Sequence, residues 1–250
     1  MLPCPRFRLL NVGYFPFPPI RHSQRRSDPV MTHFEGELQS LKERLLVMAS
    51  RAEASMARAM DALVNRDDDL ARRVREEDDA IDQLEKEIDE QAIRLLSKAP
   101  LATQLRLIVT TLKIARDLER VGDEATTIAR RSIELSQEPQ LKPYVDLPRM
   151  AQLARGMLSD SLEAFVTRDP ARARRVIPRD REVDALNKQL YRELASYMIE
   201  QPATITRCLN LMTISKAIER IADHAKNVAE DVVYLYEAQD IRHTGAVSPS

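Results

Sequence analysis

The sequence predicts an all-α protein made of two tandem antiparallel three-helix bundles, related by an internal pseudo-twofold duplication. Three observations lead to this prediction. The 250 residues include only 5 glycines and 4% aromatic residues, which argues against β-sandwiches, barrels and glycine-rich nucleotide folds. Apolar residues recur every three or four positions over long stretches, as in amphipathic helices. The second half of the body also repeats the first half.

The first 30 residues lack this periodicity. They contain six prolines, and five arginines against a single acidic residue, so the slight net negative charge of the chain belongs to the remainder. We expect residues 1–30 to be a disordered leader. Thr32 and Glu35 have the spacing of a capping box at the start of a helix. We therefore hypothesise that translation begins at Met31.

Residues 31–137 are predicted to form the first bundle. Its first helix ends at a turn at Asn65–Asp67, and the second runs through Val74 and stops before Pro100. The third fades near Ser136. The apolar stripe of the first helix comprises Leu38, Leu41, Leu45, Met48, Ala52, Met56, Ala59 and Leu63. Each helix would be marginally stable alone, and packing of its apolar stripe against two neighbours stabilises it.

Residues 138–148 hold three prolines and no period, which indicates a linker. The second bundle is predicted over residues 149–240, and residues 241–250 are expected to form a disordered tail. Three segments of the first bundle return at a nearly constant offset of about 100 residues, which indicates a tandem duplication. VNRDDDLARRV returns as VTRDPARARRV, DDAIDQLEKEI as DREVDALNKQL, and KIARDLERVGDEATTIAR as TISKAIERIADHAKNVAE.

Pairs of carboxylates recur at matching places in the two bundles. Residues four apart lie on one helix face, where like charges repel by a few tenths of a kcal/mol. The repetition suggests that a positive ion sits between them. The pairs are Glu119 with Asp123, Glu219 with Asp223, Asp78 with Asp82, and Asp180 with Asp184. If the apolar stripes form the core, all four pairs lie away from it.

Several oxygen ligands presented together suit hard cations such as Mg²⁺, Mn²⁺, Ca²⁺ or iron. Zn²⁺ also belongs to the set of expected metals, and His224 would add a nitrogen ligand beside Asp223. The alternative is an ordinary charged helix face. In that case Arg116 or Arg120 in the first bundle, and Lys216 or Lys226 in the second, would neutralise the acids.

Several function classes are excluded by what the sequence lacks. The net charge of −1 gives no attraction to nucleic acid, and the longest apolar stretch is too short for a membrane span. No Walker spacing of glycines and no Glu-x-x-His motif occurs. Cys4 and Cys208 form no close-spaced motif, which suits a reducing cytosol. We therefore expect a cytoplasmic binding protein rather than an enzyme.

The segments DLERVGD (117–123) and IERIADHAKNVAEDVVYLY (218–236), with the opening HFEGELQSLKERLLVMA (33–49), resemble the PhoU family of phosphate-uptake regulators. The resemblance covers roughly residues 31–240. It implies two three-helix bundles, often assembled as a homodimer, with metal clusters on surface acidic motifs. The metal motifs of the family fall on Glu119, Asp123, Glu219 and Asp223, and the flanking acidic motifs on Asp78, Asp82, Asp180 and Asp184. Glu124 and Thr127 stand where the family often has His and Asn.

The resemblance also implies a function. Members of that family act in the bacterial cytoplasm as negative regulators of the phosphate-starvation response. They link the ATPase subunit of the high-affinity phosphate ABC transporter to a sensor histidine kinase, at the periphery of a membrane complex. A metalloenzyme acting on phosphate compounds and a purely structural adaptor bundle are the alternatives. Turnover by metal-loaded protein would favour the metalloenzyme, and absence of metal would favour the structural adaptor.

Overall fold

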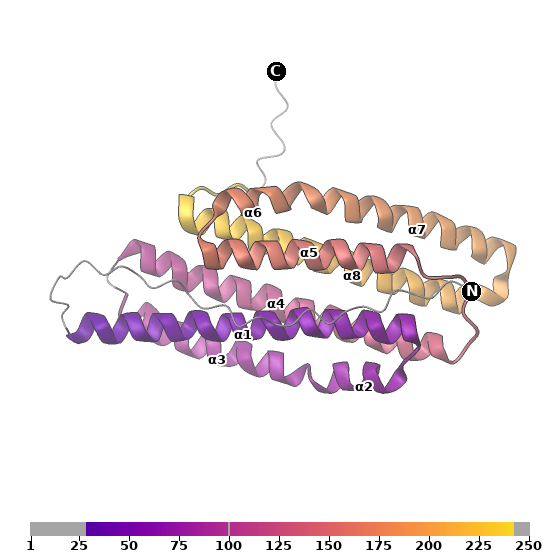
Figure 1. Cartoon of the computed structure of the whole chain (residues 1–250), viewed down its shortest axis with the longest axis horizontal. Coiled ribbons are helices and arrows are strands. Elements are labelled where there is room, and N and C mark those ends of the chain that lie inside the picture. Colours follow the sequence, from indigo (N-terminus) through magenta and orange to yellow (C-terminus); the bar gives the residue numbers. More distant parts are fainter. Residues whose placement is uncertain (1–28, 100, 243–250) are drawn as a thin grey trace, which may run out of the picture.

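The computed structural model describes residues 29–99 and 101–242, and every regular element within them is helical (Figure 1). The predicted leader and the end of the predicted tail therefore lie largely outside the described residues. The elements are α1 (Pro29–Asn65), α2 (Asp68–Glu76), α3 (Asp79–Leu96), α4 (Ala102–Ser136), α5 (Asp146–Thr167), α6 (Pro170–Val176), the 3₁₀ helix η1 (Ile177–Arg179), α7 (Asp180–Glu200), the 3₁₀ helix η2 (Pro202–Thr204) and α8 (Ile205–Glu237).

The helices form two units that lie side by side with their long axes roughly aligned. The first unit contains α1 to α4 and the second contains α5 to α8 (Figure 1). In each unit a long first helix and a long last helix pack against a middle helix that is interrupted. The predicted all-α fold with two tandem three-helix bundles is thus confirmed, with the middle helix of each bundle in two pieces.

The predicted apolar stripes form the core. In α1, Leu41, Leu45 and Met48 are completely buried, and in α8 the apolar side chains from Ile214 to Val228 that recur every three or four residues are buried as well. The apolar side chains of both units belong to one continuous cluster. Because the long helices of both units contribute to this cluster, burial of apolar area holds the two units together as well as stabilising each one.

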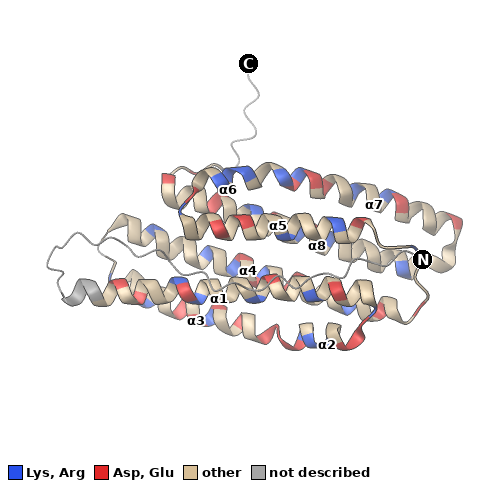
Figure 2. Cartoon of the chain, in the orientation of Figure 1, with Lys and Arg blue, Asp and Glu red and all other residues tan. Residues whose placement is uncertain are grey.

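The middle helix of the first unit differs from the prediction of one continuous helix through Val74 to Leu95. It ends after Glu76 and starts again at Asp79, so that Glu77 and Asp78 form a break. Residues 76–79 are four consecutive acids. Carboxylates are unfavourable at a helix C-terminus and favourable at an N-terminus, which favours a break at this point. Figure 2 shows the acidic residues at both ends of α2.

The second unit is interrupted at the equivalent place by η1, which contains Pro178. Proline removes a backbone donor from the helix interior and favours such a break. The break therefore brings Asp180 to the first position of α7, as the break in the first unit brings Asp78 to the N-cap of α3.

The turn that joins the first and middle helices repeats closely between the units. Asp67 and Asp169 each cap the following helix, with an Oδ1 atom that accepts the backbone N–H three residues later at 2.9 Å. The residues before these caps, Arg66 and Arg168, both adopt a left-handed conformation, with φ of 54° and 58°. The predicted turn at Asn65–Asp67 is confirmed. Its capping aspartate and its left-handed arginine both recur at the equivalent turn of the second unit.

The expected capping box at Thr32 does not form the start of α1. The helix begins at Pro29, so Thr32 lies inside it. Proline is favoured in the first turn of a helix because its φ is already helical and its missing N–H would have no intrahelical partner. The helix therefore begins four residues nearer the N-terminus than a capping box at Thr32 would place its first residue, His33.

The two units meet through their last helices, α4 and α8, which form the most extensive helix–helix interface of the fold. Lys113 lies opposite Asp231, with Nζ and Oδ1 at 3.0 Å, and Arg220 lies opposite Glu124, with Nη1 and Oε1 at 3.1 Å. Rising numbers in α4 pair with falling numbers in α8, so the helices are antiparallel. If the two units are exchanged, the same antiparallel pairing of α4 with α8 results. This is the expected pseudo-twofold relation.

Among the described residues, no helix combines the length and the apolar content that crossing a membrane requires.

Candidate functional site

Five carboxylates gather where the start of α3 packs against the middle of α4. We call this group the first acidic cluster, and it consists of Asp78, Asp82 and Glu85 from α3 with Glu119 and Asp123 from α4. All five side chains are partly buried. The sequence pattern therefore brings both predicted pairs of the first unit together. Glu85 was not among the predicted residues, although its spacing from Asp78 and Asp82 places it on the same face of α3.

The carboxylates of the first acidic cluster affect each other's protonation. Burial raises the pKa of Asp78, and the nearby charges of Asp82 and Asp123 raise it further. Burial likewise raises the pKa of Glu119, again with a contribution from Asp123. A desolvated carboxylate among like charges favours its protonated form unless a cation is present. The cluster is therefore a place where a positive ion would be stabilised.

Arg120 supplies part of that positive charge. Its guanidinium lies 3.1 Å from Asp123 Oδ2 and 3.3 Å from Glu119 Oε2. The Arg120 side chain is 49% exposed, and such exposed ion pairs contribute little to stability. This cation can therefore leave the carboxylates at low cost when a competing ion arrives.

Gly122 allows the start of α3 to lie close to α4. A Cβ atom at this position would lie 2.9 Å from Asp78 Oδ1 and 3.1 Å from Ile81 Cδ1. The absence of a side chain thus lets the Asp78 carboxylate rest against the α4 backbone, between the two acidic residues of that helix. Ala222 takes the corresponding place in the second unit.

The second acidic cluster consists of Asp180 and Asp184 from α7 with Glu219 and Asp223 from α8. Burial raises the pKa of Asp223, and the charges of Asp180 and Glu219 add to that effect. A lysine stands among these acids, because Lys226 Nζ donates to Asp180 Oδ2 at 2.8 Å. Thr126 is the corresponding residue of the first unit. The two clusters therefore have carboxylates at equivalent positions but differ in the basic side chain that pairs with them, which is Arg120 in the first and Lys226 in the second.

Asp180 departs from the expectation that these acids lie away from the core. It is only 6% exposed, since the break before α7 turns the first residue of that helix against α8. Its Oδ1 atom is buried and has no hydrogen-bond partner among the described residues. A buried oxygen without a partner is costly, so this atom is a candidate metal ligand.

His224, a possible metal ligand beside Asp223 in the sequence, contacts the first unit in the structure. Its Nδ1 atom is 2.8 Å from Asp117 Oδ1 of α4, and Asn227 Nδ2 donates to the same oxygen at 3.3 Å. Glu124, the corresponding residue of the first unit, pairs with Arg220 across the same interface. Positions 124 and 224 therefore connect the units. Sequence spacing alone could not reveal this, because the facing helix is more than 90 residues away.

The fit of a metal ion to the clusters rests on donor chemistry. The carboxylates, including the unpartnered Asp180 Oδ1, are the hard oxygen donors that Mg²⁺ and Mn²⁺ prefer. In the described part of the chain, no group of three or more His, Cys, Asp or Glu side chains is arranged to hold a metal ion. The residues fit the ion in kind, and binding would require their side chains to turn toward a common point. Metal binding stays a prediction.

Comparison with known proteins identifies relatives over most of the chain. The family model described as the PhoU domain matches twice, at residues 45–132 and 147–232. A phosphate-specific transport system accessory protein PhoU homolog from Pseudomonas aeruginosa is 40% identical over 218 residues, covering 86% of this chain and 90% of the relative. The phosphate-specific transport system accessory protein PhoU of Escherichia coli is 34% identical over 213 residues, covering 85% and 88%.

Solved structures agree with these sequence matches. The crystal structure of PhoU from Pseudomonas aeruginosa superposes with a TM-score of 0.80 at 40% identity, covering 82% of this chain and all of that chain. The phosphate transport system regulatory protein PhoU from Streptococcus pneumoniae superposes with a TM-score of 0.79 at 29% identity. The names of these relatives describe accessory and regulatory proteins and not enzymes, in agreement with the expectation from the sequence. With both helical units matched and nearly the whole length of these relatives covered, the chain belongs to the PhoU family.

Proposed function

We propose that this protein is an accessory protein of phosphate-specific transport that restrains phosphate uptake and the phosphate-starvation response. It would act in the cytoplasm as an adaptor between the ATPase subunit of the phosphate transporter and a sensor histidine kinase. Two observations carry the proposal together: both units match the PhoU domain, and the chain aligns with 90% of a relative named as a phosphate-specific transport accessory protein.

The helix surfaces support a role in binding other proteins. Leu105 and Val109 are exposed near the start of α4, and Ile205 and Leu209 are exposed at the corresponding places of α8. Exposed apolar side chains grouped at helical spacing favour a contact with another macromolecule. Their duplication would give the protein two related contact surfaces, which suits an adaptor or a homodimer.

We further propose that divalent metal ions bind at the two acidic clusters. In the first cluster Asp78, Asp82, Glu119 and Asp123 would supply carboxylate oxygens, and in the second Asp180, Asp184, Glu219 and Asp223 would do so. A bound ion would neutralise several carboxylates at once and change the surface charge that a partner meets. The raised pKa of Glu119 and of Asp223, each caused first by burial, supports a stabilising cation at each place.

Deletion of the gene tests the regulatory role. In cells grown with abundant phosphate, loss of the protein should raise alkaline phosphatase expression and phosphate uptake, and the full chain supplied in trans should restore both. Unchanged expression and uptake in the deletion strain would refute the proposed regulation.

A pull-down from phosphate-replete cells tests the adaptor role and the need for metal. The test variant replaces Glu119 and Glu219 by Gln and Asp123 and Asp223 by Asn, which removes charge and keeps volume. A control variant changes Asp69 to Asn and Glu134 to Gln, two exposed acids outside the clusters. Capture of transporter and kinase subunits by the wild type and the control supports the adaptor role. If the test variant captures the same subunits as the wild type, and the wild type contains no metal, the protein acts as a structural adaptor without metal.

A further inference from the structure

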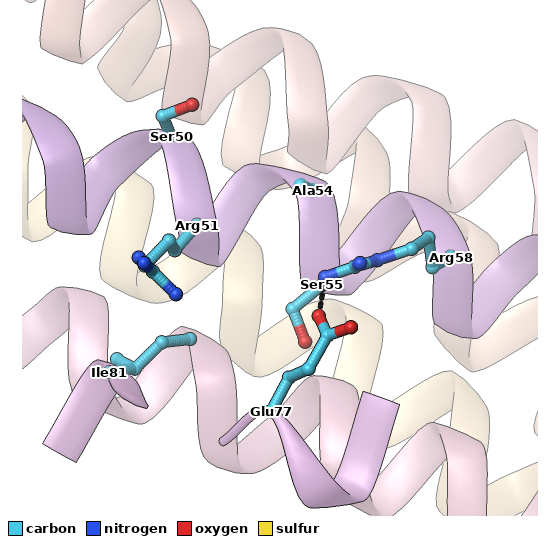
Figure 3. A pocket seen from close by; sticks show the side chains of 7 residues that line it. All are labelled: Ser50, Arg51, Ala54, Ser55, Arg58, Glu77 and Ile81. Carbon is cyan, nitrogen blue, oxygen red and sulfur yellow. Dashed lines mark ion pairs between the residues drawn. The ribbon is translucent and has the colours of Figure 1, made fainter. Parts of the chain in front are cut away.

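A cavity opens between α1 and the break that separates α2 from α3 (Figure 3). Its volume is about 240 Å³, far above the roughly 15 Å³ that a single water molecule needs. Arg51, Ser55 and Arg58 line it from one face of α1, and Glu77 and Ile81 line it from the opposite side. It is thus large enough for a small polyatomic ligand.

The cavity contains hydrogen-bond donors that are not used by the protein. Ser55 is 3% exposed, and its Oγ atom has no hydrogen-bond partner among the described residues. The Nε atom of Arg58 is also buried and without such a partner, although the same guanidinium forms an ion pair with Glu77. Buried polar groups in native proteins are normally satisfied, and one that is not calls for a ligand or a water molecule.

The second unit provides an internal comparison at an offset of 102 residues. The Arg58–Glu77 ion pair corresponds to the ion pair between Asp160 and Arg179, with the charges exchanged. Ser55 corresponds to Met157, which is completely buried. The duplicated fold therefore accepts an apolar residue at this position, and the unpartnered hydroxyl is a feature of the first unit alone.

Arg51 shows the same difference between the units. It corresponds to Leu153 in the second unit, and it lies on one side of Ser55 while Arg58 lies on the other (Figure 3). Among the residues that line the cavity, two guanidinium groups stand against one carboxylate, so the lining itself carries one net positive charge. The unused Oγ–H and Nε–H groups, together with Arg51, are donors suited to an oxyanion.

We propose that this cavity binds a small tetrahedral oxyanion, and that the oxyanion is inorganic phosphate. Arg51, Ser55 and Arg58 would donate to its oxygens. Glu77 would select among oxyanions, because its carboxylate can accept a hydrogen bond from an ion that carries a proton. Phosphate carries at least one proton at neutral pH and sulfate carries none, so an adjacent carboxylate favours phosphate and repels sulfate. The inference rests on the cavity and its second-unit counterpart, independently of the proposed regulatory role.

Titration calorimetry of the purified full chain with inorganic phosphate tests the proposal. The wild type should bind phosphate at least tenfold more tightly than sulfate. The variants Ser55→Met and Arg51→Leu introduce the residues that the second unit already carries, and each should weaken phosphate binding at least tenfold. Arg94→Leu removes the same charge from an exposed position of α3 and should leave binding unchanged.

Three results would overturn the proposal: no phosphate binding by the wild type, equal binding of sulfate and phosphate, or full binding by the Arg51→Leu variant. Thermal unfolding of each variant checks that it is folded, and Arg51 is exposed enough for its replacement to leave the core intact. The Glu77→Gln variant provides a separate measurement of selectivity. Because an amide can donate a hydrogen bond to sulfate, this variant should show a preference for phosphate over sulfate that is at least threefold smaller than that of the wild type. The gene-deletion phenotype is measured separately, so a failure of this proposal leaves the regulatory role standing.

Discussion

Replacing Lys113 by Met should destabilise the protein, because it removes the partner of a buried carboxylate between the two units. Asp231 is 8% exposed in its side chain, and Lys113 Nζ lies 3.0 Å from its Oδ1 atom. Removing one member of a buried pair costs roughly 3–5 kcal/mol. Lys113 is 34% exposed, so water replaces part of its interaction, and we expect a loss of about 2–3 kcal/mol. For a protein of this size that corresponds to a fall of roughly 5–10 °C in Tm.

The assay is urea and thermal unfolding of the wild type and the variant, with Lys98→Met as the control. Lys98 forms a more exposed ion pair with Glu37, at 3.2 Å, and its loss should cost at most about 1 kcal/mol. Equal losses in the two variants would refute the reasoning.

The pH dependence gives a second check on the Lys113→Met variant. Burial raises the pKa of Asp231 and Lys113 lowers it, so the variant raises that pKa further. The folded variant therefore holds this proton more tightly than the unfolded chain does, and its stability falls as the pH rises through the pKa of the folded state. The deficit should be largest near neutral pH and should shrink as the pH falls toward the ordinary carboxyl range of about 4. A deficit that is independent of pH would point to lost packing instead.

Three further predictions concern the duplicated features. Lys226→Thr, which introduces the residue of the first unit, should increase Mn²⁺ affinity at the second acidic cluster by calorimetry, and unchanged affinity would argue against Lys226 as a competitor for the ion. Asp67→Ala and Asp169→Ala should each lower the free energy of unfolding by about 1 kcal/mol in urea titrations, since each removes a helix cap. Gly122→Val should cost at least about 2 kcal/mol in the same titrations, because its Cβ atom would lie 2.9 Å from Asp78 Oδ1. Gly36→Val, where a Cβ atom meets nothing within 4 Å, should be nearly neutral, and a similar loss at both glycines would contradict the packing argument.

The helices and their buried faces could be predicted because they depend on local patterns. Leu41, Leu45 and Met48 follow the helical period and are completely buried. The turn before Asp67 could be predicted from its composition, and its repetition before Asp169 from the duplication. The break at Glu77 and Asp78 was missed, because the apolar period continues across it and the competing effect is the charge of four consecutive acids.

The candidate site could be predicted only in part. Spacing on one helix places Glu119 beside Asp123, and the duplication does the same for Glu219 and Asp223. The close approach of α3 to α4 depends on Gly122 and on the break before α3. The apolar pattern within one helix cannot predict such a contact between two helices. His224 was assigned to the cluster from its neighbour in sequence, whereas its contact with Asp117 depends on how the two units pair.

The antiparallel pairing of α4 with α8 bears on how two copies of an ancestral half became one chain. Two identical halves joined by a twofold axis would place Lys113 against Arg131 if both were the first half. Two copies of the second half would place Arg220 against His224. In the present chain Asp231 stands in place of Arg131 opposite Lys113, and Glu124 stands in place of His224 opposite Arg220. Opposite charges therefore face each other at both places. A first half therefore matches a second half better than it matches another first half, which disfavours pairing between like halves of two molecules.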